Sequence, residues 1–425
     1  MLKGKIAKLA VSDVRFPTSL EQHGSDAMHA NPDYSAAYVV IETDDGLKGY
    51  GITFTVGRGT EIVVCAVEAL STLVIGKTLE DIVSNFSGFY RCLTSDSQMR
   101  WIGPEKGVIQ LASAAILNAI WDMWARAEGK DPKQLIRCID FRYITDALTE
   151  QEALSELISI EEEMLKEGYP AYTTSCAWLG YSDQQLTQLC STALTEGWTK
   201  FKVKVGADLQ DDIRRCSLIR KMIGPENSLM IDANQRWDVA EAISYVTKLA
   251  EFRPLWIEEP TCPDDILGHA AISKALAPLG IGVATGEQCH NRVMFKQFLQ
   301  ASALQFVQID SCRVGSVNEN LAIMLMAAKF RVPVCPHAGG VGLCELVQHL
   351  ILFDYISVSA SLENRMCEYV DHLHEHFKSP TVIRNAHYMP PKDPGFSSEM
   401  FDESVQKHQF PHGEVWRSIL EKNGS

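Results

Sequence analysis

The sequence predicts an N-terminal α+β domain followed by a (β/α)8 barrel of the TIM type. Its 425 residues exceed one ordinary domain, so two domains are expected. Short apolar runs end in Lys204, Asp232, Glu258 and Glu287, which are 28, 26 and 29 residues apart along the chain. Each interval has the length of one strand, one helix and two loops. Because the strands of such a barrel point their C-terminal ends at one mouth, these charged side chains should converge there.

Residues 1–135 are predicted to form the α+β domain. Two β-prone runs within 38–52 flank an Asp-Asp-Gly turn, which is a strong hairpin signal. Helical periodicity follows and is strongest over 108–128. Before the hairpin, residues 19–34 are polar and contain glycine and proline, so we expect a loop there.

Residues 136–376 are predicted to form the barrel and to carry the active site. Strand-like and helical segments alternate through this stretch, and an Asp-Val-Ala-Glu capping box at 238–241 starts one helix. Residues 377–425 are irregular and are expected to pack back on the N-terminal domain. The eight expected barrel strands end near Cys176, Lys204, Asp232, Glu258, Glu287, Asp310, His337 and Tyr369.

Composition and charge argue against several classes of function. The formal net charge is −15, so no broad basic face for nucleic acid is expected. No apolar run approaches the roughly 18 to 20 residues that span a bilayer, so no membrane partner is expected. The 12 cysteines lack metal-binding spacing, and several, such as Cys335 and Cys367, lie in apolar runs typical of buried free thiols. A soluble intracellular protein is expected, with cytoplasm and mitochondrion both open.

Asp232, Glu258 and Glu287 form an all-oxygen trio at consecutive strand ends. Hard cations such as Mg²⁺ prefer such ligands. Any single one of the 54 acidic residues could be an ordinary solvated side chain, but three that each end an apolar run at one-unit spacing favour a metal site. We therefore predict one Mg²⁺ per subunit. Glu259 competes with Glu258, but strand alternation should direct its side chain to the opposite face.

Lys202 and Lys204 share strand parity, so both should point into the barrel mouth. A neighbouring ammonium group and a nearby divalent cation would each disfavour the charged form and lower the pKa of a lysine. One of the two is therefore a candidate general base. The alternative, a pair of solvated lysines, suits an antiparallel hairpin better than a central parallel strand.

Asp310 ends the sixth expected strand, and His337 ends the seventh. An aspartate bonded to one imidazole nitrogen fixes the tautomer and raises the basicity of the other nitrogen. A proline before His337 and Ala-Gly-Gly after it place this histidine at an open strand-to-loop turn. By contrast, a second group that follows the last strand is expected to be mostly solvated rather than a metal cluster: His372, His374 and His376.

In order along the chain, these motifs resemble those of the enolase superfamily, mandelate racemase subgroup. The resemblance rests on Lys202-Val-Lys204, Asp232-Ala-Asn234, Ile257-Glu-Glu-Pro260, Gly286-Glu287, Asp310-Ser-Cys-Arg-Val-Gly315 and Cys335-Pro-His337. It covers nearly the whole chain, because the N-terminal domain is similar to that family's capping domain. Within the subgroup the chain is most similar to L-fuconate dehydratases, in Gly286-Glu-Gln-Cys-His-Asn291 and Glu368-Tyr-Val-Asp-His-Leu-His374. The linkers over 130–138 and before Tyr169 are shorter than usual in the family, but neither touches a motif.

The resemblance implies a role for each site residue. Asp232, Glu258 and Glu287 are similar to the Mg²⁺ ligands of the family. Lys204 resembles the base that removes the proton α to the substrate carboxylate. His337, oriented by Asp310, resembles the acid that helps the 3-hydroxyl to leave. The substrate-binding positions implied by the resemblance are Gly24, Ser25, Asp26, Tyr34, Lys202, Asn234, Glu287, His337, Ala338, Gly339 and Glu368.

The implied reaction is Mg²⁺-assisted dehydration of an acid sugar, with L-fuconate as the expected substrate and 2-keto-3-deoxy-L-fuconate as the product. Two alternatives stay open: racemisation or dehydration of another acid sugar, and a binder that keeps the fold without catalysis. A binder would tolerate the loss of Asp232, Lys204 or His337, and all three are present. A small acid sugar is therefore the expected partner, and a homo-oligomer is compatible with the resemblance.

Overall fold

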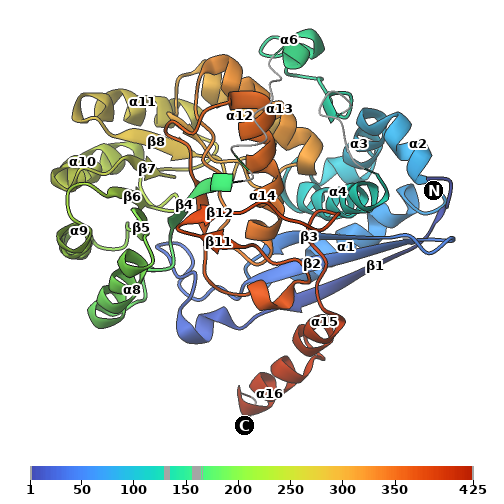
Figure 1. Ribbon diagram of the computed structural model, residues 1–425, viewed down its shortest axis with the longest axis horizontal. Helices are drawn as coiled ribbons and strands as arrows, with labels where there is room; N and C mark the ends of the chain where they lie inside the picture. Colours follow the sequence, from blue (N-terminus) through green and yellow to red (C-terminus); the bar gives the residue numbers. More distant parts are fainter. Residues whose placement is uncertain (1, 129–134, 156–163, 165, 424–425) are drawn as a thin grey trace.

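The computed structural model describes residues 2–128, 135–155, 164 and 166–423. A three-stranded antiparallel sheet lies near the N-terminus, and a mostly parallel nine-stranded sheet forms the barrel (Figure 1). The fold class predicted from the sequence is confirmed. The expected short linkers fall largely on residues 129–134, 156–163 and 165, which lie outside the described residues.

The capping domain begins with a sheet in the order β1-β2-β3. Its strands are β1 (Ile6–Arg15), β2 (Ser35–Thr43) and β3 (Lys48–Thr55). The predicted hairpin is β2–β3, whereas β1 is a strand that the sequence pattern did not predict, because Lys8, Ser12 and Asp13 interrupt its apolar residues. The helices that follow are α1 (Thr60–Leu70), α2 (Leu79–Ser84), α3 (Phe86–Thr94) and α4 (Gly107–Ala127).

Helix α4 packs directly on the backbone of β3. A Cβ atom at Gly49 would lie 2.3 Å from the carbonyl oxygen of Ala119, and one at Gly51 would lie 2.2 Å from that of Ala115. Only glycine therefore allows this approach of helix and strand. Contrary to the expectation from the sequence, α4 is long and apolar enough to cross a membrane, but 83% of its most apolar window is buried inside the protein. Such burial is typical of a core helix.

The barrel strands run parallel around the ring. They are β4 (Tyr169–Thr173), β5 (Lys200–Lys204), β6 (Ser228–Asp232), β7 (Trp256–Glu258), β8 (Gly282–Thr285), β9 (Phe306–Val307) and β10 (Cys367–Tyr369). The seventh expected strand is an extended stretch in which Val334 makes a single parallel bridge to Val307. The amide of Glu368 donates to the carbonyl of Pro336, and β10 pairs with β4, so the ring closes.

Helices cover the outside of the barrel (Figure 1). They are α8 (Asp183–Thr195), α9 (Leu209–Ile223), α10 (Val239–Leu249), α11 (Ile266–Leu276), α12 (Arg292–Gln300), α13 (Ser316–Phe330) and α14 (Leu343–Phe353), with the short α6 (Glu150–Ser155) before β4. The predicted capping box of Asp238 and Glu241 starts α10. A π-helical turn, Asp354–Ser359, extends α14.

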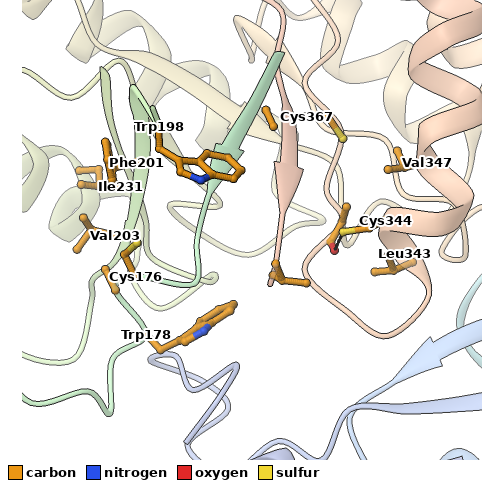
Figure 2. Packing of buried hydrophobic residues seen from close by; sticks show 14 of the residues in the cluster. Cys176, Trp178, Trp198, Phe201, Val203, Ile231, Leu343, Cys344, Val347 and Cys367 are labelled. Atoms are coloured by element: carbon orange, nitrogen blue, oxygen red, sulfur yellow. Dashed lines mark hydrogen bonds between the residues drawn. The ribbon is translucent and has the colours of Figure 1, made fainter. Parts of the chain in front are cut away.

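The barrel core has an inner and an outer layer. One cluster contains alternate strand residues such as Tyr172, Met230 and Trp256, and the strand alternation places it inside the ring. The outer layer joins strands to helices: Figure 2 shows Phe201 and Ile231 on one side and Leu343, Cys344 and Val347 on the other. The prediction of buried free thiols at Cys335 and Cys367 is confirmed.

The C-terminal segment returns to the capping domain. It contains β11 (Ile383–Arg384), β12 (His387–Tyr388), α15 (Asp402–His408) and α16 (Glu414–Asn423). The amide of Met400 donates to the hydroxyl of Tyr38 at 3.1 Å, and the indole of Trp416 donates to the carbonyl of Arg15 at 2.8 Å. These bonds tie the end of the chain to the first sheet.

Candidate active site

The strand register brings the predicted charged residues together at the barrel mouth. Lys204 pairs with Asp232 across β5 and β6, and Asp232 pairs with Glu258 across β6 and β7. Glu287 follows β8 after a sharp turn at Gly286, where φ is +146° and a Cβ atom would lie 2.2 Å from the carbonyl oxygen of Gln308. Glycine is therefore required for the chain to turn Glu287 into the mouth.

The two lysines of β5 differ in their access to the mouth. Lys202 is fully buried, and its Nζ lies 2.6 Å from Glu258 Oε1, 2.8 Å from Glu368 Oε1 and 3.4 Å from Asp232 Oδ2. Lys204 lines the cavity above the mouth, and its Nζ lies 2.5 Å from Asp232 Oδ2. Lys202 is therefore a buried counterion, and Lys204 is the one of the two that lines the cavity.

The protein groups around the two lysines raise their pKa values, so a lowered pKa would depend on the divalent cation. Burial by itself would lower the pKa of Lys204, but the carboxylate of Asp232 outweighs both burial and the neighbouring ammonium, so the pKa is raised. For Lys202, burial is likewise outweighed by Glu258 and Glu368, and the pKa is raised well above its usual value. The expectation counted the second ammonium and missed the carboxylates in direct contact.

His337 and Asp310 form the expected pair. Nδ1 of His337 lies 2.7 Å from Asp310 Oδ2, and Asp310 Oδ1 accepts the backbone amides of Cys312 and Arg313. On the other side, Nε2 lies 3.3 Å from Glu287 Oε2. Burial opposes protonation, but Glu287 and the bond to Asp310 raise the pKa of His337 to about 9. At neutral pH the imidazole is therefore protonated, with an N–H directed at the mouth.

The mouth gathers buried acidic and basic side chains. Six buried carboxylates, those of Asp232, Glu258, Glu259, Glu287, Asp310 and Glu368, accompany three cationic side chains, those of Lys202, Lys204 and His337. Burial and Asp232 raise the pKa of Glu258 to about 8, and burial and Glu287 raise the pKa of Glu259 well above its usual value. Carboxyl groups gathered in this way are stabilised by a divalent cation.

Several buried polar atoms at the mouth lack hydrogen bonds to the described residues. They are Oδ1 of Asn234, Oε1 of Glu259 and both side-chain atoms of Gln308. Among the described residues, no group of three His, Cys, Asp or Glu side chains is already arranged around a metal position, since Asp232 and Glu258 contact lysines and Glu287 contacts His337. The cluster of carboxyl oxygen donors nevertheless fits Mg²⁺ chemically.

The argument from strand alternation does not apply to Glu259. Strand β7 ends at Glu258, and Glu259 has a φ of +44°. The side chain is completely buried, and its Oε2 accepts from Gln235 Nε2 at 2.5 Å. Glu259 is not among the residues that line the cavity, and burial and the neighbouring Glu287 raise its pKa well above the usual value.

A cavity of about 360 Å³ lies between the barrel mouth and the capping domain. The predicted site residues that line it are Gly24, Asp26, Tyr34, Lys204, Asn234, Glu287, Asp310, His337, Gly339 and Glu368. Five others do not line it: Ser25, Lys202, Asp232, Glu258 and Ala338. The sequence analysis did not single out other lining residues, including His29, Phe54, Arg58, Trp178, Gln288 and Arg313. Gln288 and Arg313 lie inside motifs quoted for the resemblance, although no role was inferred for them, whereas no motif marks the other four, which come from separate segments of both domains.

Two of the residues that do not line the cavity, Lys202 and Ala338, position a residue that does. The amide of Ala338 donates to Glu368 Oε2 at 3.0 Å, and the hydroxyl of Thr174 donates to Glu368 Oε1. With Lys202, these bonds hold Glu368 at the edge of the cavity. The same carboxylate lies 3.7 Å from Nε2 of His337. Lys202 and Ala338 therefore position a cavity residue instead of facing the cavity.

The expectation that the three later histidines are mostly solvated is wrong. Their side chains are only 15–17% exposed. His374 lies flat on Tyr369 and its Nδ1 lies 2.6 Å from Glu345 Oε1, while His372 stacks on Tyr34 below the cavity. His376 contacts Ser404 and His408 of the returning C-terminal segment. The local sequence could not reveal these contacts.

The barrel has acidic residues at the ends of its strands, and a lysine and a histidine line the cavity under the capping domain. This combination defines a class of α/β enzymes. Residues 17–136 match the family model of the mandelate racemase / muconate lactonizing enzyme N-terminal domain, and residues 185–404 match that of the enolase C-terminal domain-like family. The chain belongs to the enolase superfamily, among the members with these two domains. The resemblance inferred from the motifs is thereby confirmed.

Named relatives cover almost the whole chain. It is 73% identical over 441 aligned positions to "Mitochondrial enolase superfamily member 1" of Xenopus laevis, with 99% of each protein covered. It is 50% identical over 418 positions to "L-galactonate dehydratase" of Hypocrea jecorina, which covers 94% of this chain and 92% of the relative. Sequence similarity therefore extends through both domains.

Solved structures show the same fold. The crystal structure of human mitochondrial enolase superfamily member 1 matches with a TM-score of 0.95 at 69% identity, covering 99% of both chains. That of L-talarate/galactarate dehydratase from Salmonella typhimurium LT2, liganded with Mg and L-lyxarohydroxamate, matches with a TM-score of 0.74 at 24% identity, covering 95% of this chain and 92% of the other. The second likeness concerns the fold alone.

Proposed function

We propose that the protein is a Mg²⁺-dependent dehydratase of acid sugars. The observation that carries the proposal is that Lys204 and His337 line one cavity, between the mouth and the capping domain, from well-separated strands of the barrel. A base and an acid so placed reach a substrate from different sides, as the elimination of water requires. The name of the relative L-galactonate dehydratase, at 50% identity, supports the same class of reaction.

Each charged residue at the mouth has a task in this proposal. Asp232, Glu258 and Glu287 would hold Mg²⁺, which supplies a positive charge that stabilises the negative charge developing on the substrate carboxylate. Nζ of Lys204, whose pKa the cation held at Asp232 would lower so that the amine is neutral, takes the proton from the carbon α to that carboxylate. His337, protonated at Nε2, gives its proton to the departing 3-hydroxyl, which leaves as water. The enol that remains tautomerises to a 2-keto-3-deoxy acid.

Within this class we propose L-fuconate as the substrate. The segment after Glu287 and the segment around Glu368 support this choice, because both resemble those of L-fuconate dehydratases. L-Galactonate is the second candidate, since it differs from L-fuconate by a hydroxymethyl group in place of the terminal methyl. The cavity wall contains Val56, Val108 and Leu111, and an apolar wall suits a methyl group.

Turnover of an acid-sugar panel tests the proposed function. The purified protein is incubated with Mg²⁺ and each acid, and 2-keto acid is measured by a colour reaction. We expect L-fuconate to have the highest kcat/KM and L-galactonate to follow by about tenfold, the difference that one buried polar or apolar group makes. If C2 is inverted and no 2-keto acid forms from any acid, the protein is a racemase.

Removal of the metal is expected to stop the reaction. Asp232→Asn replaces a charged oxygen ligand by a neutral one, so we expect weaker Mg²⁺ binding and a fall in kcat/KM of about 10²-fold or more. Calorimetric titration with Mg²⁺ measures the first effect, and the 2-keto acid assay measures the second. Circular dichroism should show an intact fold. Full activity in excess EDTA would remove the metal from the mechanism.

The cellular location is proposed from the relatives. The names of the proteins from Xenopus laevis and Homo sapiens contain the word mitochondrial, and both are at least 70% identical to this chain over its whole length. We place the protein in the mitochondrion on this basis. The sequence left cytoplasm and mitochondrion open, and this proposal selects the mitochondrion.

A further inference from the structure

Residues 19–34, several of which line the cavity, are called the lid. The carboxylate of Asp26 organises a turn within it. Oδ1 of Asp26 accepts the backbone amides of Met28 and His29, both at 2.7 Å. The amide of Asp26 in turn donates to the carbonyl of His29 at 3.0 Å. The side chain of Asp26 is only 8% exposed. Its carboxylate is thus engaged within the turn, although the resemblance implies that Asp26 binds substrate.

The same carboxylate orients a histidine. Nδ1 of His29 lies 3.1 Å from Asp26 Oδ2 and 3.2 Å from Oδ1. The ring lines the cavity and is 40% exposed. Among the described residues, Nε2 of His29 has no hydrogen-bond partner, unlike both ring nitrogens of His337 and His374. Asp26 holds Nδ1 of the ring, so Nε2 is the nitrogen that can bond to a ligand in the cavity.

The rest of the lid is fastened to the barrel. The carbonyl of Ser25 accepts the amide of Leu179 at 3.0 Å, and its hydroxyl accepts the amide of Gly180 at 3.0 Å. Both partners belong to the loop after β4. Ser25 therefore fixes the position of the turn relative to the mouth, and this anchorage accounts for its absence from the cavity lining.

We propose that His29 is the lid residue that hydrogen-bonds a hydroxyl group of the acid-sugar substrate through Nε2, and that Asp26 is a positioning residue that orients the ring. The proposal rests on the proposed function and assigns a specificity contact to a residue that no motif marks. Two charged groups of the mouth, Glu287 and Lys204, lie close enough to His29 to influence its pKa, which the bond to Asp26 raises. His29 lines the same cavity as both of these groups.

A double-mutant cycle separates this role from a structural one. His29→Ala is expected to lower kcat/KM about 10- to 100-fold through a higher KM, the effect of losing one hydrogen bond to substrate. Asp26→Asn should lower kcat/KM about tenfold in the wild-type background, because the ring loses its orientation. In the His29→Ala background the same change should have almost no effect, since no ring remains to orient. An equal Asp26→Asn effect in both backgrounds would show that Asp26 acts only on the loop.

Binding measured without turnover keeps the two proposals apart. In a Lys204→Ala background, calorimetry with L-galactonate and with L-fuconate gives Kd directly, and adding His29→Ala should raise it by the same 10- to 100-fold. An unchanged Kd would overturn the role of His29 even if wild-type dehydration is efficient. If the wild type forms no 2-keto acid but the Kd still rises, the dehydratase fails and the lid contact stands. His412→Ala, at an exposed histidine that does not line the cavity, is the matched control.

Discussion

Replacing Lys204 by alanine is expected to abolish both the dehydration of the acid sugar and the exchange of its α-proton with D₂O. Lys204 is the lysine that lines the cavity, whereas Lys202 is sealed among Glu258, Glu368 and Asp232. Removal of a general base costs about 10²- to 10⁴-fold, and both processes begin with the same proton transfer. The 2-keto acid assay follows the first, and proton NMR in D₂O follows the second.

A third lysine on the same strand provides the control. Lys200 shares the parity of Lys204 but starts β5, at the opposite end of the barrel from the mouth. Lys200→Ala should therefore keep both activities near the wild-type level. If Lys204→Ala continued to exchange the α-proton at the wild-type rate, the base would have to be another group, with His337 as the first candidate.

The His337→Asn variant is expected to separate the two processes. Without the protonated Nε2, the 3-hydroxyl has no acid to help it leave, so 2-keto acid formation should fall by about 10²- to 10⁴-fold. Exchange of the α-proton should persist, because Lys204 is untouched. Asparagine is close to histidine in size and retains a polar side chain beside Asp310. The same NMR sample shows both results, as loss of the α-proton signal without product.

The aspartate behind the histidine offers a graded comparison. Asp310→Asn should lower dehydration by about 10- to 100-fold, less than loss of the imidazole itself, because Asp310 only orients and charges the ring. Exchange should again survive. Should His337→Asn stop exchange while Lys204→Ala preserves it, the assignment of base and acid is reversed.

The sequence predicts the fold well where local patterns repeat. Apolar runs that end in Lys204, Asp232 and Glu258 are spaced by one strand-and-helix unit, and the register of β5, β6 and β7 places these residues side by side. Central parallel strands are buried on both faces, so each of them appears in the sequence as a short apolar run. The first strand, Ile6–Arg15, has no such signature, since its edge position leaves much of it partly exposed.

The finer arrangement of the site depends on contacts between distant segments. His29 lines the cavity because the lid is bonded to the loop after β4, and His372 is covered because Tyr34 and His23 stack on it. The charge balance of the mouth likewise depends on which partner each side chain contacts. Lys204 meets Asp232, and this contact reverses the direction of the pKa shift expected from the neighbouring lysine. Strand spacing carries no information about such pairings.

The bonds between the two ends of the chain bear on the order of events during synthesis. Strand β1 lies at the edge of its sheet, where Val14 pairs with Gln409 and the carbonyl of Asp13 accepts the amide of Phe410 at 2.9 Å. A chain emerging from the ribosome therefore exposes this edge until some 400 further residues have been made, and an open edge is a place where strands of other molecules add. The whole barrel is translated within that interval. The capping sheet emerges before the barrel and is completed only after it.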